Sequence, residues 1–166
     1  MHPSIDTIMQ RAPKALLRTV ESCGELTLFV RREDVVEICR FLHDDPDLAF
    51  DHITDVTAVD FPNESPRFEV VYHFYSIQKK HRIRLKARVP EDDSVIDSIC
   101  PIWQGANFLE REVYDMMGIV FRHHPDLRRI LMTEDYNEGF PLRKDFPVEG
   151  HGWRDRFDDF MQTSAS

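Results

Sequence analysis

The sequence lacks any long hydrophobic run. No window of about 18 residues, the length that a membrane-spanning helix needs, is apolar throughout. The N-terminal stretch MHPSIDTIMQRAPKALL is interrupted by charges and prolines, so it does not have the hydrophobic segment of a signal peptide. We therefore expect a cytosolic protein that meets a membrane only through its partners.

Cysteine and glycine are also scarce. Cys23, Cys39 and Cys100 are odd in number and form no C-x-x-C pair, which argues against a disulfide framework and against a cysteine-ligated cluster. We expect reduced and mostly buried thiols. The 6 glycines occur singly, so the chain has no glycine-rich loop of the kind that binds phosphate groups.

An excess of positive charge is missing as well. The 30 acidic residues outnumber the 21 basic residues and give a net charge of -9, whereas a general nucleic-acid surface needs clustered positive potential. We therefore predict no nucleic-acid partner. With 166 residues, of which 42% are hydrophobic, the chain has the size of one domain with a real core and tails.

The sequence does contain helical and strand patterns in succession, without internal repeats. Expected helices begin near Pro13, follow the capping residue Asp34, and cover residues 95–100 and 108–117. Expected strands cover residues 25–30, 51–60, 67–77 and 81–89. The pattern favours an α+β fold, a two-layer sandwich of helices on a mixed, mainly antiparallel sheet. We expect this domain over residues 1–121 and an extended C-terminal arm and tail over residues 122–166.

The expected strand HRIRLKARV has one strongly basic face. Its apolar residues alternate with Arg82, Arg84, Lys86 and Arg88. Two interpretations are open. The basic residues form a solvated face that is balanced by acids on neighbouring strands, such as Glu69, or they form a docking face for an acidic partner.

One of the expected helices, FLEREVYDMM, has an unusually high charge density. Asn107 and Glu110 have the spacing of a capping box, and Gly118 is placed to end the helix. Arg111 and Asp115 lie one turn apart and can pair, but such an exposed pair contributes only a few tenths of a kcal/mol. Stability is therefore a poor reason for so many charges.

The segment after this helix is expected to be an extended arm. The turn HHPDL leads to Arg128 and Arg129, whose guanidinium groups seek carboxylates or backbone carbonyls. Glu110, Glu112 and Asp115 lie just upstream, so an internal salt-bridge network that fixes the arm is the simplest expectation. Further on, GFPLRKDFP combines glycine, proline and charge at a density that does not form a regular element.

The residues do not form a recognisable catalytic or metal site. Glu110 and Glu112 are two positions apart, so on a helix they point to different sides, and nothing downstream supplies a nucleophile. The available metal ligands are His123, His124, Asp126 and His151. Adjacent histidines rarely converge on one ion, and an H-x-x-x-H spacing is absent. We therefore predict no catalytic, cofactor-binding or metal-ligating residue on this chain.

Three motifs in the second half of the chain resemble a known protein family. They read EREVYDMMGI, FRHHPDLRRILM and PLRKDFP. Together with weaker likeness over ITDVTAVDFP, RFEVVYHFYSI and the lead-in around Trp103, they resemble the thirty-kilodalton subunit of bacterial NADH-quinone oxidoreductase, which is respiratory complex I. The likeness covers most of the chain, from Leu26 to Pro147.

The resemblance implies a cofactor-free structural core subunit in the peripheral arm of a proton-translocating NADH:quinone oxidoreductase. The implied partners are the quinone-site subunit and the terminal iron-sulfur subunit, and the iron-sulfur clusters, FMN and quinone are expected on partner subunits. The implied location is peripheral, on the cytoplasmic face of the bacterial inner membrane. Residues that match the family motifs are implied contacts for assembly: Glu110, Arg111, Glu112, Tyr114, Asp115, His124, Asp126, Arg128, Arg129, Arg143, Lys144 and Asp145.

Two alternatives remain. Similar subunits occur in membrane-bound hydrogenases and in other donor-linked dehydrogenases, so the family is better defined than the electron donor. A freestanding metal-dependent enzyme is the alternative from a different class.

Overall fold

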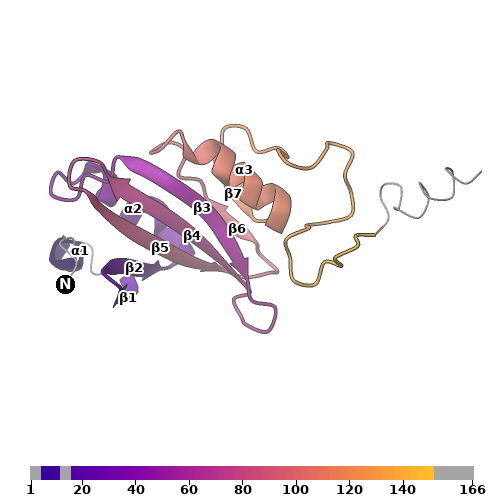
Figure 1. Cartoon of the computed structure of the whole chain (residues 1–166), viewed down its shortest axis with the longest axis horizontal. Coiled ribbons are helices and arrows are strands. Elements are labelled where there is room, and N and C mark those ends of the chain that lie inside the picture. The colour runs from indigo at the N-terminus through magenta and orange to yellow at the C-terminus, as the bar shows by residue number, and fades with distance from the viewer. Residues whose placement is uncertain (1–4, 12–15, 152–166) are drawn as a thin grey trace, which may run out of the picture.

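The computed structural model describes residues 5–11 and 16–151 and is shown in Figure 1. Within these residues, five strands form one sheet, and helices pack on the face that carries the core. A long C-terminal segment follows helix α3 (Ala106–Met117). The expected two-layer α+β fold is therefore confirmed.

The main sheet is mixed. Its strands are β1 (Leu16–Ser22), β2 (Glu25–Val30), β3 (His52–Asp60), β4 (Phe68–Ser76) and β5 (His81–Val89), and they lie in the order β1-β2-β5-β4-β3. The β1–β2, β4–β5 and β3–β4 pairs are antiparallel, whereas β2 and β5 are parallel. The mainly antiparallel sheet that the sequence predicts is thus present.

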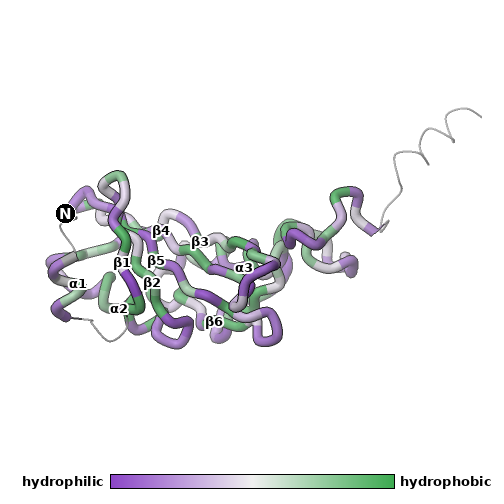
Figure 2. The backbone as a smooth tube through the Cα atoms, turned by 90° about the horizontal axis from the view of Figure 1, so that it is seen from below, coloured by the Kyte–Doolittle hydropathy of each residue, from purple (hydrophilic) through white to green (hydrophobic). Residues whose placement is uncertain are grey.

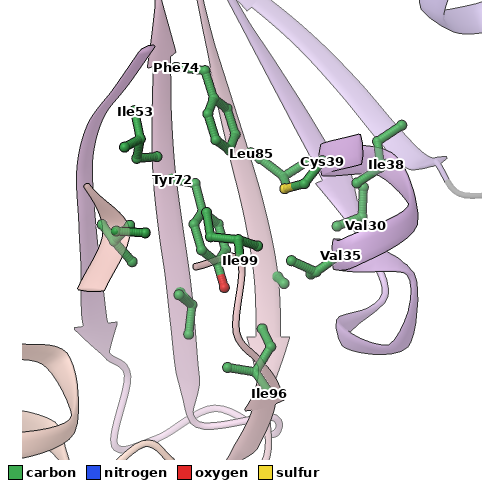
Figure 3. Packing of buried hydrophobic residues seen from close by; sticks show 14 of the residues in the cluster. Val30, Val35, Ile38, Cys39, Ile53, Tyr72, Phe74, Leu85, Ile96 and Ile99 are labelled. Carbon is green, nitrogen blue, oxygen red and sulfur yellow. The ribbon is translucent and has the colours of Figure 1, made fainter. Parts of the chain in front are cut away.

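The period-two pattern of β4 and β5 decides which face of the sheet carries the core. Tyr72 and Leu85 lie opposite each other in the register and are both fully buried. Helix α2 (Val35–Asp44) covers this face with an apolar stripe that includes Ile38 and Cys39, as Figure 3 shows. The opposite face of the sheet carries the polar residues of the same strands.

A second, smaller pair of strands extends the layer over the core. The remaining elements are helix α1 (Ile5–Arg11), the 3-10 helix η1 (Arg32–Asp34), β6 (Val95–Asp97) and β7 (Val120–Arg122). Strands β6 and β7 pair in parallel, and Ile96 and Ile99 join the same buried cluster as the residues of α2 (Figure 3). Helices α1 and α2 lie toward one end of the molecule, and the C-terminal segment leaves at the other end (Figures 1 and 2).

The expectations about membrane-spanning helices and about the cysteines can be compared with the described residues. None of the helices in this part of the chain has the length and apolar content to cross a membrane. The three cysteines form no disulfide, with Cys39 and Cys100 buried and Cys23 exposed. The thiols are therefore mostly buried, as expected.

The N-terminal part differs from the sequence prediction. A helix beginning near Pro13 is wrong, because α1 ends at Arg11 and the chain forms β1 from Leu16 onward; residues 12–15 lie outside the described residues. Cys23 and Gly24 form a two-residue hairpin turn, with φ angles of 52° and 77°. Positive φ at both positions is what a type I′ turn requires. Pairing with β2 therefore overrides the helical spacing of the apolar residues.

The short helix expected over residues 95–100 is also wrong. Val95–Asp97 forms β6, and the amide of Ser98 donates a hydrogen bond to the carbonyl of Arg122 at 2.9 Å. The partner strand β7 lies beyond α3 in the sequence, so a local pattern does not reveal the pairing.

Both expected N-terminal caps are absent. The side chain of Asp34 makes no capping hydrogen bond to α2 and instead pairs with Arg31 at 2.7 Å. Helix α3 begins directly after Gly105, so Asn107 is already inside the helix and does not form a capping box with Glu110. Glu110 is instead fully buried in the core layer.

The basic face of β5 is paired with nearby acids. Lys86 and Arg88 lie 2.8 and 3.1 Å from the carboxylate of Glu69, and Arg84 lies 3.0 Å from Glu25. This geometry agrees with the interpretation of a solvated face that is balanced within the chain. Docking of an acidic partner on this face stays a prediction.

Candidate assembly site on helix α3 and the C-terminal arm

Helix α3 ends at a glycine that lets the C-terminal arm, residues 123–151 in the described part of the chain, approach the helix. Gly118 has a φ of 76°, and its amide donates to the carbonyl of Tyr114 at 2.9 Å, so the expected helix stop is confirmed. A Cβ atom at this position would overlap the ring of Phe140. Glycine is therefore needed both for the backbone conformation and for the close contact with the arm.

Asp115 is fully buried near the end of α3 and holds the first part of the arm. Its Oδ2 atom accepts hydrogen bonds from three consecutive amides, those of Ile130, Leu131 and Met132, at 3.0, 2.8 and 2.8 Å. Its Oδ1 atom accepts a hydrogen bond from Arg129 at 2.6 Å. Burial alone would raise the pKa of Asp115, but these hydrogen bonds outweigh burial and lower its pKa. The carboxylate is therefore charged and partnered at both oxygens.

Arg111 holds the same stretch of the arm from one turn earlier in α3. Its buried guanidinium donates to the carbonyls of Arg128 and Arg129 at 3.2 and 3.3 Å, and it lies 3.8 Å from Asp126. Arg111 and Asp115, whose spacing suggested a pair, therefore both turn to the arm. Of the expected salt bridges between the two arginines and the acids of α3, the structure shows that of Arg129 with Asp115. Arg128 pairs with Asp126 instead, and Arg111 and Asp115 bind the backbone of the arm.

A second anchor lies where the arm returns to the sheet. Asp60, at the end of β3, accepts hydrogen bonds from Arg67 at 2.7 Å and from the amide of Lys144 at 2.8 Å. Arg67 also lies 3.0 Å from Asp145. The hydrogen bond from Arg67 is the main reason that the pKa of Asp60 is lowered. The buried ion pair of Asp60 and Arg67 therefore lies where the arm contacts the sheet, and both of its members bind the arm.

The arm is attached to the helix as well at this second position. The amide of Leu142 and the guanidinium of Arg143 donate to the carbonyls of Met116 and Met117 at 3.1 and 2.7 Å. The expected boundary between residues 121 and 122 falls inside β7, which ends at Arg122. Between its two anchors the arm loops away from α3 and returns (Figure 1).

Glu110 is also fully buried on α3, but its surroundings differ from those of Asp115. Its carboxylate accepts hydrogen bonds from the hydroxyl of Ser98 at 2.6 Å, the amide of Ile99 at 2.8 Å and the thiol of Cys100 at 3.3 Å. Burial is the largest influence and raises the pKa of Glu110. Two buried carboxylates on one helix therefore have opposite pKa shifts.

The side chain of His124 is fully buried in the turn after β7. Its Nδ1 atom accepts a hydrogen bond from the amide of Asp126 at 3.0 Å, and its Nε2 atom lies 3.1 Å from the carbonyl of Asn107. Because an amide only donates, Nδ1 carries no proton, and the ring is the neutral tautomer with its proton on Nε2. Burial lowers the pKa of His124, which agrees with a neutral ring.

Three potential metal ligands come together beneath this turn in the described part of the chain. The ligand atoms of Cys100, Glu110 and His124 lie within 4.8 Å of one another. The residues do not fit an ion well, because the Nε2 proton of His124 faces the carbonyl of Asn107. Burial also raises the pKa of Cys100 to about 12, which disfavours the thiolate that a metal needs. We interpret the group as a hydrogen-bonded packing cluster.

The sequence pattern pointed to other metal candidates and did not reveal this cluster. The side chain of His123 is 80% exposed whereas that of His124 is buried, so the adjacent histidines do not converge. Asp126 pairs with Arg128 at 3.0 Å. The backbone amide of His151 donates to Glu138. None of these contacts brings the four candidates to one point.

The second anchor was also missed. Asp60 follows Val56 and Ala58 on the core-facing side of β3, and all three are buried. A carboxylate at such a position requires a buried partner. The charged residue among the apolar, core-facing positions of β3 was therefore a usable signal for Asp60. It did not identify the partners Arg67 and Lys144.

The residues predicted as partner contacts divide by exposure. Glu110, Arg111 and Asp115 are buried, and so is the side chain of His124; Tyr114, Arg129 and Arg143 are partly buried; Glu112, Asp126, Arg128, Lys144 and Asp145 are exposed. Most of them gather at α3 and the first part of the arm, and the three around residue 144 lie at the second anchor. Their contact with a partner stays a prediction.

Both anchors of the arm lie in the part of the chain that matches a known family. Residues 28–152 match the respiratory-chain NADH dehydrogenase 30 Kd subunit. The chain belongs to this family. Two curated relatives are the corresponding NADH-quinone oxidoreductase subunits of Geobacter metallireducens, 53% identical over 146 residues, and of Geotalea uraniireducens, 50% identical over 143 residues. The alignments cover 87% of this chain and 88% of the first relative, and 86% of this chain and 85% of the second.

Two solved structures have a similar fold. A trypsin-resistant fragment of Nqo5 is 29% identical with a TM-score of 0.63, covering 74% of this chain and 97% of the fragment. A chain of the membrane-bound sulfane sulfur reductase, an archaeal respiratory membrane complex, is 25% identical with a TM-score of 0.75, covering 87% of this chain and 84% of that chain. The chain is thus a subunit of NADH-quinone oxidoreductase. A chain of a different respiratory membrane complex has a similar fold.

The opposite pKa shifts of the two buried carboxylates lead to a testable difference. Asp115→Asn should lower the free energy of unfolding by about 3 kcal/mol at pH 7, because the partly buried guanidinium of Arg129 and three amides lose a charged acceptor. Glu110→Gln should change it by less than about 1 kcal/mol, because an amide keeps the same shape and removes a charge that burial disfavours. Denaturant unfolding of the isolated chain measures both.

The pH dependence gives the control. The native pKa of Asp115 is lowered, so its stabilisation is present above the unfolded pKa of about 3.9 and is lost as the pH falls through the native pKa. The native pKa of Glu110 is raised, so ionisation of this group lowers stability as the pH rises through that pKa, and Glu110→Gln should remove this loss. Equal effects of the two substitutions at all pH values would contradict the assignment.

Proposed function

We propose that this chain is a cofactor-free structural core subunit of the peripheral arm of a proton-translocating NADH:quinone oxidoreductase. It supports the quinone-site subunit and the terminal iron-sulfur subunit at the cytoplasmic face of the bacterial inner membrane. Iron-sulfur clusters, FMN and quinone belong to partner subunits. Membership of the 30 Kd subunit family supports this proposal, and so does the construction of the arm.

The observation that carries the proposal is an arm that is anchored to α3 and to the sheet but leaves several apolar side chains exposed. Its backbone is held by Asp115 and Asp60, which are buried. Leu131 and Leu142 are nevertheless 58% and 53% exposed, and Val148 is fully exposed. Apolar side chains on a fixed segment bind a partner at a small entropic cost, because the segment is already ordered.

This construction gives the predicted contact residues two roles. The buried members, such as Asp115 and Arg111, position the arm through its backbone. The exposed members, such as Glu112, Arg128 and Lys144, are the ones that can touch a partner directly. Charged residues around an apolar centre give an interface its specificity.

The alternatives differ in what supports them. The likeness to a chain of the membrane-bound sulfane sulfur reductase favours keeping a subunit of another donor-linked complex as the second candidate. A freestanding metal-dependent enzyme has less support, because Cys100, Glu110 and His124 are engaged in hydrogen bonds with neighbouring side chains and with the backbone. The same residues would have to lose these bonds to hold an ion.

Charge reversal at the paired arginines tests the assembly role. The sequence alone predicts that reversing Arg128 and Arg129 impairs assembly more than the fold. The structure separates the two positions: the side chain of Arg128 is 65% exposed, whereas Arg129 faces the buried carboxylate of Asp115. Arg128→Glu should leave the unfolding transition nearly unchanged and reduce co-purification of partner subunits. Arg129→Glu should lower the free energy of unfolding by about 3 kcal/mol, because it places two carboxylates together.

A conservative variant supplies the control for this comparison. Arg128→Lys keeps the charge and should retain the partners. Normal yield of the partner subunits with Arg128→Glu, at unchanged stability, would count against the assembly role of this residue.

Metal and flavin analysis tests the absence of a cofactor. The chain purified without its partners should contain iron, zinc and flavin only far below one equivalent, because the Cys100 thiol keeps its proton and the potential ligands Glu110 and His124 are hydrogen-bonded to other groups. A stoichiometric metal that disappears in Cys100→Ser, together with turnover of a substrate, would favour the freestanding enzyme instead.

A further inference from the structure

A groove separates the N-terminal half of α3 from the turn that follows β7. Its volume is about 660 Å³, and its walls include Pro101 and Phe108 on one side and His123, Pro125 and Arg128 on the other. This volume holds several side chains and lies within the range of specific binding pockets. The groove is distinct from the apolar residues of the arm that support the proposed function.

Phe108 is the most unusual residue of this groove. It is 62% exposed, whereas Ala106, Glu110 and Arg111 on the same helix are buried. The guanidinium of Arg111 lies 5.7 Å from the centroid of its ring, so the ring is held beside a cation while much of its surface faces solvent. An aromatic side chain that is exposed in a polar-rimmed hollow is typical of the central residue of an interface.

The walls of the groove are fixed before anything binds. The buried ring of His124 connects the turn to α3, since Nδ1 accepts from the amide of Asp126 and Nε2 faces the carbonyl of Asn107. Arg111 ties α3 to the carbonyl of Arg128 on the opposite wall. A preorganised groove loses little conformational freedom on binding.

The charges of the groove favour an acidic ligand group. Two guanidiniums, those of Arg111 and Arg128, share the single carboxylate of Asp126 at 3.8 and 3.0 Å. The lining thus has one positive charge more than it has carboxylates, in a chain whose net charge is -9. A carboxylate from another molecule would complete the pairing at Arg128, whose side chain is 65% exposed.

We infer that this groove binds an extended segment of a partner subunit, which inserts an apolar side chain beside Phe108 and places a carboxylate at Arg128. The inference rests on the proposed function, because it assumes that the chain assembles with other subunits. A second copy of this chain is a poorer occupant. In a two-fold contact centred on the groove, two linings that each carry an excess of positive charge would face each other, and like charges repel.

Site-directed photocrosslinking in the assembled complex tests this inference. A benzophenone amino acid in place of Phe108 should crosslink to a partner subunit, at a peptide that contains Asp or Glu beside an apolar residue. The matched control is the same amino acid in place of Ile77, which is 61% exposed on the turn after β4 and should give no crosslink to that peptide. A crosslink from position 108 only to a second copy of this chain, or to no protein, would overturn the inference.

Substitution of the same residue measures its contribution. Phe108→Ala should weaken binding to the partner about tenfold or more, whereas Ile77→Ala should leave it unchanged. Both side chains are largely exposed, so the unfolding transition of either variant should stay close to that of the wild type. Equal affinity of Phe108→Ala and the wild type would overturn the inference.

The outcomes also separate this inference from the proposed function. If the wild-type chain co-purifies with the other subunits but position 108 gives no crosslink, the groove is wrong and the proposed function stands. If the wild-type chain does not co-purify with them at all, the proposed function itself is wrong.

Discussion

The arrangement of this protein depends on one buried carboxylate. Asp115 accepts hydrogen bonds from three consecutive amides of the arm and from Arg129, and it has no exposed surface. An unpartnered charge at this depth would be strongly destabilising, so the arm and the helix require each other. The close approach at Gly118 and the backbone contacts of Arg111 follow from the same docking.

Helix α3 therefore supports both the domain and the arm through its buried acids. Its two buried acids are used in different ways, since Glu110 packs against Ser98 and Cys100 in the domain while Asp115 binds the arm. The arm is held by its backbone, which leaves apolar side chains such as Leu131 free to face outward. A fixed backbone with outward apolar residues suits a subunit whose task is to join other subunits.

Local sequence patterns predicted the sheet, the hairpin of β4 and β5, the helix stop at Gly118 and the charged helix, because each depends on neighbouring residues. They failed at β1, where the helical spacing of the apolar residues concealed a hairpin with β2, and at β6, whose partner β7 lies beyond α3 in the sequence. At the candidate site, the motifs identified the charged residues but not which of their side chains face the core and which face solvent. Glu110 and Glu112 look alike in sequence, yet one is buried and the other exposed, because only tertiary packing decides which side of α3 faces the core.

Hydrogen exchange at the amides of Leu131 and its two neighbours tests the role of Asp115 most directly. Leu131 is 58% exposed, so slow exchange at these amides requires the carboxylate as acceptor. In the wild type these amides should exchange slowly. Asp115→Ala should make them exchange rapidly, while Glu112→Ala leaves them slow and both variants keep slow exchange in β4. Equally rapid exchange in the wild type and in Asp115→Ala would contradict the central role of this carboxylate.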